Sequence, residues 1–170
     1  MINKPDFKTI PEYYHYYTNL VQENNLLNAL EKQMLTTILF LKAIPEEIGN
    51  FRYAENKWSV KEVISHIMDT ERIMCYRALR FSRKDKTELA GYDENLYAPN
   101  SNAQNRNVPD MLEEYEAIRR ATIHLFRSMN EEMVNESAIA NKYSVTVKGI
   151  GWMIAGHELH HIKVIKEKYL

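Results

Sequence analysis

Glycine and proline are scarce in this chain, and their placement constrains the fold more than any other feature. Only five of each occur among 170 residues, and they cluster between long segments in which apolar residues recur at helical spacing. A sheet of comparable size would need many turns, which use these two residue types. The sequence therefore predicts an all-α protein. We see no repeat or composition break, so a single domain spanning 1–170 is expected, large enough to bury a hydrophobic core.

Four major helices are expected, because helix-start signals precede each periodic segment. Ser59 stands three residues before Glu62, which is the capping-box arrangement. The helices are expected to run from Pro11 to about Ala43 with a break at Asn24-Asn25, from Ser59 to about Phe81, from Pro109 at a first helical position to about Met129, and from an N-cap at Thr146 towards Tyr169. Residues 84–108 are polar and turn-rich, which predicts a long loop between the second and third major helices. Four such helices favour a four-helix bundle.

Charge and cysteine content exclude several classes of partner. The 22 basic and 23 acidic residues nearly cancel and form no basic block, which argues against nucleic acid or an anionic membrane as a partner. No long uncharged apolar run or signal-peptide layout is present. The single Cys75 fits a reducing compartment, so a cytoplasmic protein is expected. Cys75 lies about 180° round its helix from His66, and we expect it to be a small core residue.

Two histidines on the last helix continue its apolar stripe. Ile150, Ile154, His157, His161 and Ile165 follow helical offsets, and imidazoles four residues apart can reach one metal ion. A hydrogen-bonded pair in the core is the alternative. His160 is a competitor that fits the stripe less well, because it is rotated by about 100° from His161.

The segment His157-Glu158-Leu159-His160-His161 also satisfies the H-E-x-x-H pattern of zinc peptidases. Such enzymes take a third ligand downstream, but only nine residues follow, and positions 164 and 167 hold Val and Glu where the extended pattern needs Gly and His. The match is therefore interpreted as accidental, and a third ligand must come from upstream. His66 is the best candidate, since it lies on the inward side of the second major helix. Glu62, Asp69 and Thr70 could orient its ring, whereas His15 and His124 have no supporting pattern.

The order and separation of several segments make the chain similar to the DinB superfamily, and within it to the YfiT-like branch of metal-dependent hydrolases. The segments are KWSVKEVISHIMDTER, GYDENLYAP, EYEAIRRATIHLF and the terminal GHELHHIKVI. The resemblance places His66 in the family's first ligand position and His157 and His161 in the other two. It implies a four-helix bundle with one divalent ion, zinc or nickel, and often a homodimer. The activities it implies include thiol S-transferases that use bacillithiol or mycothiol.

Two classes of function follow from such a site. Three neutral histidines leave a divalent ion with open positions. Water bound at such a position has its pKa lowered from about 15.7 towards about 7, which supports hydrolysis. A substrate thiolate bound there would instead support S-transfer. A small-molecule substrate is expected in both cases. Glu158 is a candidate base if it turns inward, although we expect it to face solvent. Asp93, Tyr92 and Arg119 are candidates to line the substrate entrance. The alternative is a non-catalytic helical binding or dimerisation module with a closed or plugged site.

Overall fold

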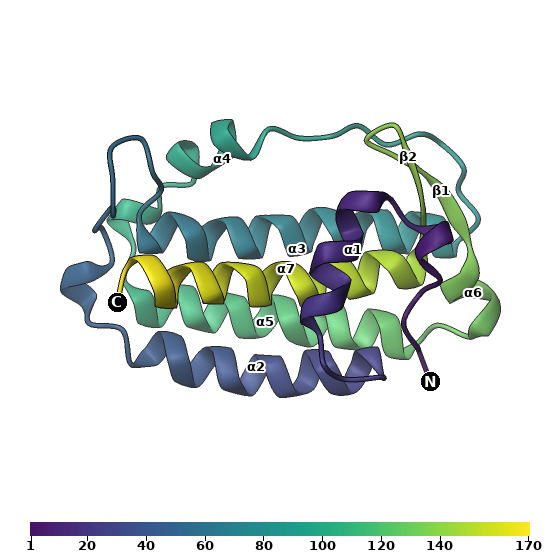
Figure 1. Ribbon diagram of the computed structural model, residues 1–170, viewed down its shortest axis with the longest axis horizontal. Helices are drawn as coiled ribbons and strands as arrows, with labels where there is room; N and C mark the ends of the chain where they lie inside the picture. Colours follow the sequence, from purple (N-terminus) through teal and green to yellow (C-terminus); the bar gives the residue numbers. More distant parts are fainter.

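Four long helices lie side by side in the computed structural model, which describes residues 1–170 (Figure 1). They are α2 (Leu26–Lys42), α3 (Val60–Ser82), α5 (Val108–Arg127) and α7 (Val147–Lys168). Helix α7 packs against α3 and α2, while α5 packs against the same two helices. The predicted all-α four-helix bundle is therefore confirmed, and α7 is the helix with neighbours on most of its sides. None of the helices is both long enough and apolar enough to cross a membrane.

Local capping fixes where all four of these helices begin. The Asn25 side chain accepts from the backbone N–H groups of Leu27 and Asn28 at the start of α2. Ser59 and Glu62 form the predicted capping box, and Thr146 caps α7 as predicted. Helix α5 starts one residue earlier than expected, because Asn107 is its N-cap and places Pro109 second in the helix. The second N–H of a helix also lacks an intrahelical partner, so proline is tolerated there.

The predicted break near Asn24 separates α2 from a short helix, α1 (Glu12–Leu20), which follows the 3₁₀ turn η1 (Phe7–Thr9). Helix α1 lies across α7 (Figure 1). The crossing is close because Gly156 has no side chain: a Cβ there would overlap the backbone carbonyl of Tyr17. This contact brings the Tyr17 side of α1 against the half of α7 that carries the histidines.

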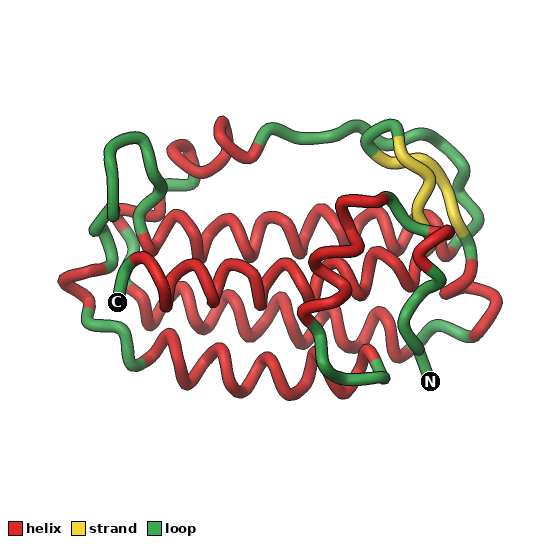
Figure 2. The backbone as a smooth tube through the Cα atoms, in the orientation of Figure 1, coloured by secondary structure: helices red, strands yellow, loops and turns green.

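The two polar stretches carry more structure than expected. Residues 84–108 include α4 (Glu94–Asn100) and the 3₁₀ turn η3 (Ala103–Asn105), and they run along the outside of α3 (Figures 1 and 2). Beyond α5, α6 (Glu131–Asn135) leads into an antiparallel hairpin of β1 (Ser137–Ala140) and β2 (Tyr143–Thr146), with Ser137 opposite Thr146. The turn residues Asn141 and Lys142 have φ of 50° and 69°. The 3₁₀ turn η2 (Glu46–Ile48) follows α2.

The hairpin anchors the long connection after α3. Leu89 donates its N–H to Ile139 O and accepts from the N–H of Asn141, which forms a single bridge beside β1. Since the residues that follow Leu89 lead directly to Tyr92 and α4, the hairpin determines how this connection passes over the bundle. This short hairpin, which was not expected from the sequence, is an addition to the all-α bundle.

Candidate metal centre

Three histidines converge between α3 and α7. His66 comes from α3 and is buried, while His157 and His161 come from adjacent turns of α7. The Nε2 atom of His157 lies 3.0 Å from Nε2 of His66 and 3.1 Å from Nε2 of His161. One nitrogen from each ring lies within 4.8 Å of the others, so the group could hold a metal ion. The structure thus brings together the three residues that the sequence analysis selected.

Helix packing and spacing explain this convergence. Residues four apart on α7 project on the same side of the helix, one turn above the other. That side faces α3, the helix with which α7 makes its most extensive contact. The Trp58 ring packs on His66 with ring centroids 4.7 Å apart. His66 is consequently held by the capping region of its own helix as well as by α7.

The donor set fits a metal ion better than it fits hydrogen bonding. A neutral imidazole has one N–H donor and one acceptor nitrogen, yet Nε2 of His157 is approached by two other ring nitrogens at nearly equal distance. A single lone pair or N–H cannot bond well to both. A metal bound to three imidazoles requires such convergence of neutral nitrogens. The three rings therefore fit a divalent ion.

Burial keeps these rings neutral. Desolvation lowers the pKa of His66 to about 4, with a smaller contribution from His160. Desolvation likewise lowers the pKa of His161 to about 2 and that of His157 well below its ordinary value, and the neighbouring histidines add to both effects. Neutral imidazole is the form that binds a metal. At neutral pH no proton has to leave before an ion can bind.

A cavity of about 360 Å³ adjoins the three histidines. Tyr92, from the long connection after α3, lines it as predicted, and its hydroxyl lies 2.6 Å from Thr70 Oγ1. Burial raises the pKa of Tyr92, so its hydroxyl stays protonated at neutral pH. His160 also lines the cavity, with Nδ1 3.2 Å from the hydroxyl of Tyr16. The site thus combines a possible metal position with space for a small molecule.

Three further candidates lie elsewhere than predicted. Asp93 is exposed and caps α4, accepting from the N–H groups of Asn95 and Leu96, and it does not line the cavity. Arg119 is fully buried in the bundle and lines no entrance. Glu158 is only 1% exposed, which corrects the expectation that it faces solvent.

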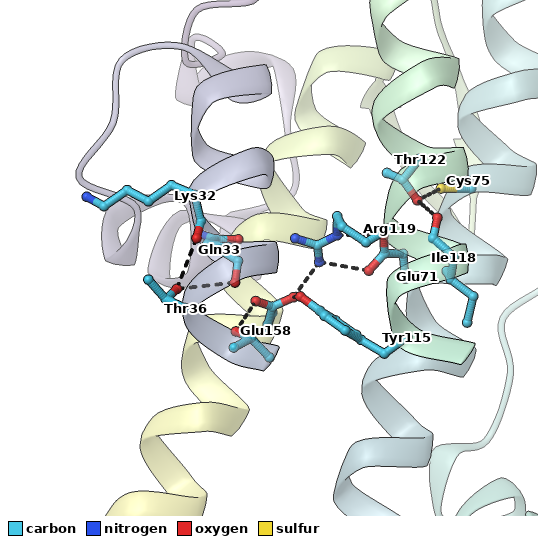
Figure 3. A network of polar contacts seen from close by, with 11 residues as sticks. Lys32, Gln33, Thr36, Glu71, Cys75, Tyr115, Ile118, Arg119, Thr122 and Glu158 are labelled. Carbon is cyan, nitrogen blue, oxygen red and sulfur yellow. Dashed lines mark hydrogen bonds and ion pairs between the residues drawn. The ribbon is translucent and has the colours of Figure 1, made fainter. Parts of the chain in front are cut away.

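Glu158 and Arg119 belong to a buried polar network that lies apart from the cavity (Figure 3). Arg119 donates from Nε and Nη2 to the two carboxylate oxygens of Glu71, at 2.9 and 2.8 Å, and Nη2 also pairs with Glu158. Glu158 accepts in addition from Thr37 Oγ1 at 2.7 Å and from the Tyr115 hydroxyl at 2.8 Å. Because these donors hold both of its oxygens, Glu158 is not available as a base at the histidines.

The residues expected to orient His66 have other partners. The Glu62 carboxylate pairs with Arg52 and accepts from the backbone N–H of Ser59. The Thr70 hydroxyl contacts Tyr92, and Asp69 does not line the cavity. Cys75 is only half-buried, 3.1 Å from Thr122 Oγ1, and burial raises the pKa of its thiol to about 12. The cysteine lies outside the cavity, consistent with its calculated position on the far side of α3.

Sequence reasoning missed other residues that line the cavity: Tyr13, Tyr17, Trp58, Arg77, Asn141 and Met153. A signal existed for Arg77, which follows His66 by eleven residues and so returns to the same side of an α-helix within about 20°. No comparable signal existed for Tyr17 or Asn141. They reach the cavity through the crossing of α1 and through the hairpin, which are tertiary features.

A model of the DinB superfamily matches residues 29–165. The chain therefore belongs to the DinB superfamily.

Among solved structures it is similar to YfiT from Bacillus subtilis, which is described as a probable metal-dependent hydrolase with an unusual four-helix bundle topology. The two share 15% sequence identity with a TM-score of 0.70, over 97% of this chain and 91% of that one. This likeness supports the shared fold. The search of curated proteins gave no match.

Proposed function

We propose that this protein is a metal-dependent enzyme of the hydrolase type that acts on a small molecule. The observation that carries the proposal is the convergence of His66, His157 and His161 beside an open cavity. Their donor set of three neutral nitrogens suits zinc or nickel. When bound there, a divalent ion supplies Lewis-acid polarisation and activation of water near neutral pH.

The protein's own groups supply the surroundings that such chemistry needs. Trp58 packs its ring against His66 and contributes an apolar surface to the cavity wall. The paired hydroxyls of Thr70 and Tyr92 can donate to or accept from a substrate at the cavity wall. The side chain of His160 lines the same wall and is held by Tyr16, where it can accept or return a proton.

A thiol S-transferase would use the same three ligands, with a substrate thiolate in place of water. A screen of substrates with and without an added thiol distinguishes the two activities. A non-catalytic module predicts a closed or plugged site. The adjoining cavity of about 360 Å³ instead supports an enzyme.

Metal content and activity measured together test the proposal. We expect about one zinc or nickel ion per wild-type chain, and a large loss in His66→Ala. His124→Ala is the matched control, since His124 is an exposed histidine on α5 outside the site. The metal-loaded protein is then screened against esters, lactones and amides, and against electrophiles with added thiols.

Equal metal in wild type and His66→Ala would refute the ligand assignment. Turnover that needs a thiol would identify the S-transferase instead. Full metal loading with no turnover in either screen would favour the binding module.

A further inference from the structure

Arg77 is a buried cation without an acidic partner. Three lysine or arginine residues of the chain are buried: Lys61, Arg77 and Arg119. Lys61 pairs with Glu46 at 2.5 Å, and Arg119 pairs with Glu71 and Glu158. Arg77 is only 4% exposed, yet no carboxylate lies within 4.0 Å of its guanidinium. Removing a cation from water costs several kcal/mol unless an opposite charge compensates it.

The protein partners of Arg77 use only part of its hydrogen-bonding capacity. Nη2 donates to the carbonyl of Ala90 at 2.8 Å, and Nη1 approaches the weak acceptor Sδ of Met74 at 3.7 Å. A guanidinium has five N–H groups. The others face no protein acceptor, and Arg77 lines the same cavity as the three histidines. The unused donors are therefore available to a ligand in that cavity.

Arg77 and the histidines lie at two ends of this cavity. His66 and Arg77 lie on the same side of α3, and their Cα atoms are separated by a rise of about 16 Å. Thr70 and Met74 line the cavity between them. The contact of Nη1 with Met74 shows that the Arg77 side chain leans back towards the histidines. Because the His66 side chain leans in the same direction, the two groups are separated along the helix by about 12–16 Å.

Other polar side chains line the cavity together with Arg77. Tyr13 and Tyr92 line the cavity, and burial raises the pKa of both while the positive charge of Arg77 opposes that increase. Both hydroxyls therefore remain protonated at neutral pH and can donate. Asn141 adds an amide from the hairpin turn. A guanidinium beside neutral donors is suited to an oxyanion.

The balance of charge indicates a single negative charge on the ligand. Arg77 is the only lysine or arginine in the lining, and Glu94 lines the same cavity. One guanidinium matches one carboxylate, whereas a phosphate dianion would bring a second negative charge into the lining that contains Glu94.

We propose that Arg77 binds a carboxylate of the substrate, so that the molecule spans the cavity with its reacting end at the histidines. This inference rests on the proposed function for the identity of the reacting end. The substrate class is a small monocarboxylic acid whose reactive group lies about 12–16 Å from the guanidinium along the cavity. The opposing interpretation is that Arg77 only donates a hydrogen bond to the Ala90 carbonyl and so holds the connection after α3 in place.

The test compares two ligands that differ only in charge. Zinc-loaded protein is titrated in a calorimeter with 6-mercaptohexanoate and with 6-mercaptohexan-1-ol, whose thiolates are the metal-facing end. Wild type should bind the acid at least about tenfold more tightly than the alcohol, as expected for a charge-assisted hydrogen bond. Arg77→Met should bind both equally, with wild-type affinity for the alcohol. Arg80→Met, which removes a partly exposed arginine of the same helix that lies outside the cavity lining, should keep the preference.

A wild type without preference, or a preference that survives in Arg77→Met, would overturn the proposal. If Arg77→Met fails to fold, Arg77→Lys keeps the charge but loses the two-pronged donor. It should reduce the preference several-fold, and an unchanged preference would also count against the proposal.

A second experiment, on metal-free protein, tests the carboxylate site independently of the proposed function. Metal-free wild type and Arg77→Met are compared by saturation-transfer NMR with hexanoate and hexan-1-ol. Selective binding of hexanoate that depends on Arg77 would support the carboxylate site even if elemental analysis finds no metal. Equal signals from both ligands in wild type would refute it.

Discussion

The Arg119→Met substitution tests whether the buried network stabilises the bundle. Arg119 is 0% exposed, while its partners Glu71 and Glu158 are 2% and 1% exposed. Methionine fills much of the same volume but removes the only cation between two carboxylates. Glu71 would then have no donor at all, because both of its recorded side-chain hydrogen bonds come from Arg119.

The expected cost follows from leaving buried charges unpaired. Removing one partner of a buried ion pair costs about 3–5 kcal/mol. That is a large part of the roughly 5–15 kcal/mol by which a domain is stable. For a chain of this length each kcal/mol lowers the Tm by about 2–4 °C, so the decrease should be about 6–20 °C. Urea unfolding followed by tryptophan fluorescence measures the free energy, since Trp152 is fully buried.

Glu158→Gln is the matched control within the same network. It keeps the shape and removes one of the two negative charges that surround a single guanidinium. The hydroxyl of Thr37 can rotate to accept from the new amide. We expect a cost of about 1 kcal/mol. If Arg119→Met costs no more than Glu158→Gln, the network does not hold its charges as argued, and the reasoning fails.

Three further predictions concern other parts of the chain. Burial lowers the pKa of His66 to about 4 and that of His161 to about 2, from an ordinary value of 6.5. Below pH 6.5 the unfolded metal-free chain therefore binds more protons than the folded chain. Its unfolding free energy should therefore fall on acidification from pH 6.5 towards 4, by about 1.4 kcal/mol per pH unit for each histidine, and a flat urea-derived profile would contradict this. Gly156→Ala should lower the free energy of unfolding by about 1–3 kcal/mol, since the new methyl overlaps the Tyr17 carbonyl. Faster hydrogen exchange in α1 would locate the effect at the crossing of α1 and α7. An unchanged exchange rate and Tm would show that the two helices do not cross so closely. Ser59→Ala should cost about 1 kcal/mol in thermal unfolding through loss of the capping box, and a change below about 0.3 kcal/mol would show that the box contributes little.

Features governed by local sequence could be predicted. The caps at Ser59 and Thr146 depend on a side chain and backbone groups three residues away, so the sequence contains both partners. The pairing of His157 with His161 depends on the period of one helix. Adding His66 required only the inward side of a second helix, and the bundle then brought the two sides together.

The error at Glu158 has a different physical cause. In a helix with one buried face, a polar residue rotated by about 100° from that face is exposed to solvent. Helix α7 instead packs against α1, α2 and α3. Its neighbours therefore bury Glu158 as well as His157. A signal was present, since the nine residues from Gly149 to His157 include no Asp, Glu, Lys or Arg. A stretch without charge on all sides indicates a helix buried all round, in which a following glutamate needs partners.

The consecutive positions of His157 and Glu158 connect the network with the metal centre. One side chain points to the cavity, and the next is held by Thr37, Tyr115 and Arg119 on another side of the same helix. Rotation or translation of α7 that moved the His157 ring from the other two would also break these bonds to Glu158. The charged network lies outside the cavity, but it therefore restricts the position of His157, a proposed metal ligand, more firmly than neutral packing alone would.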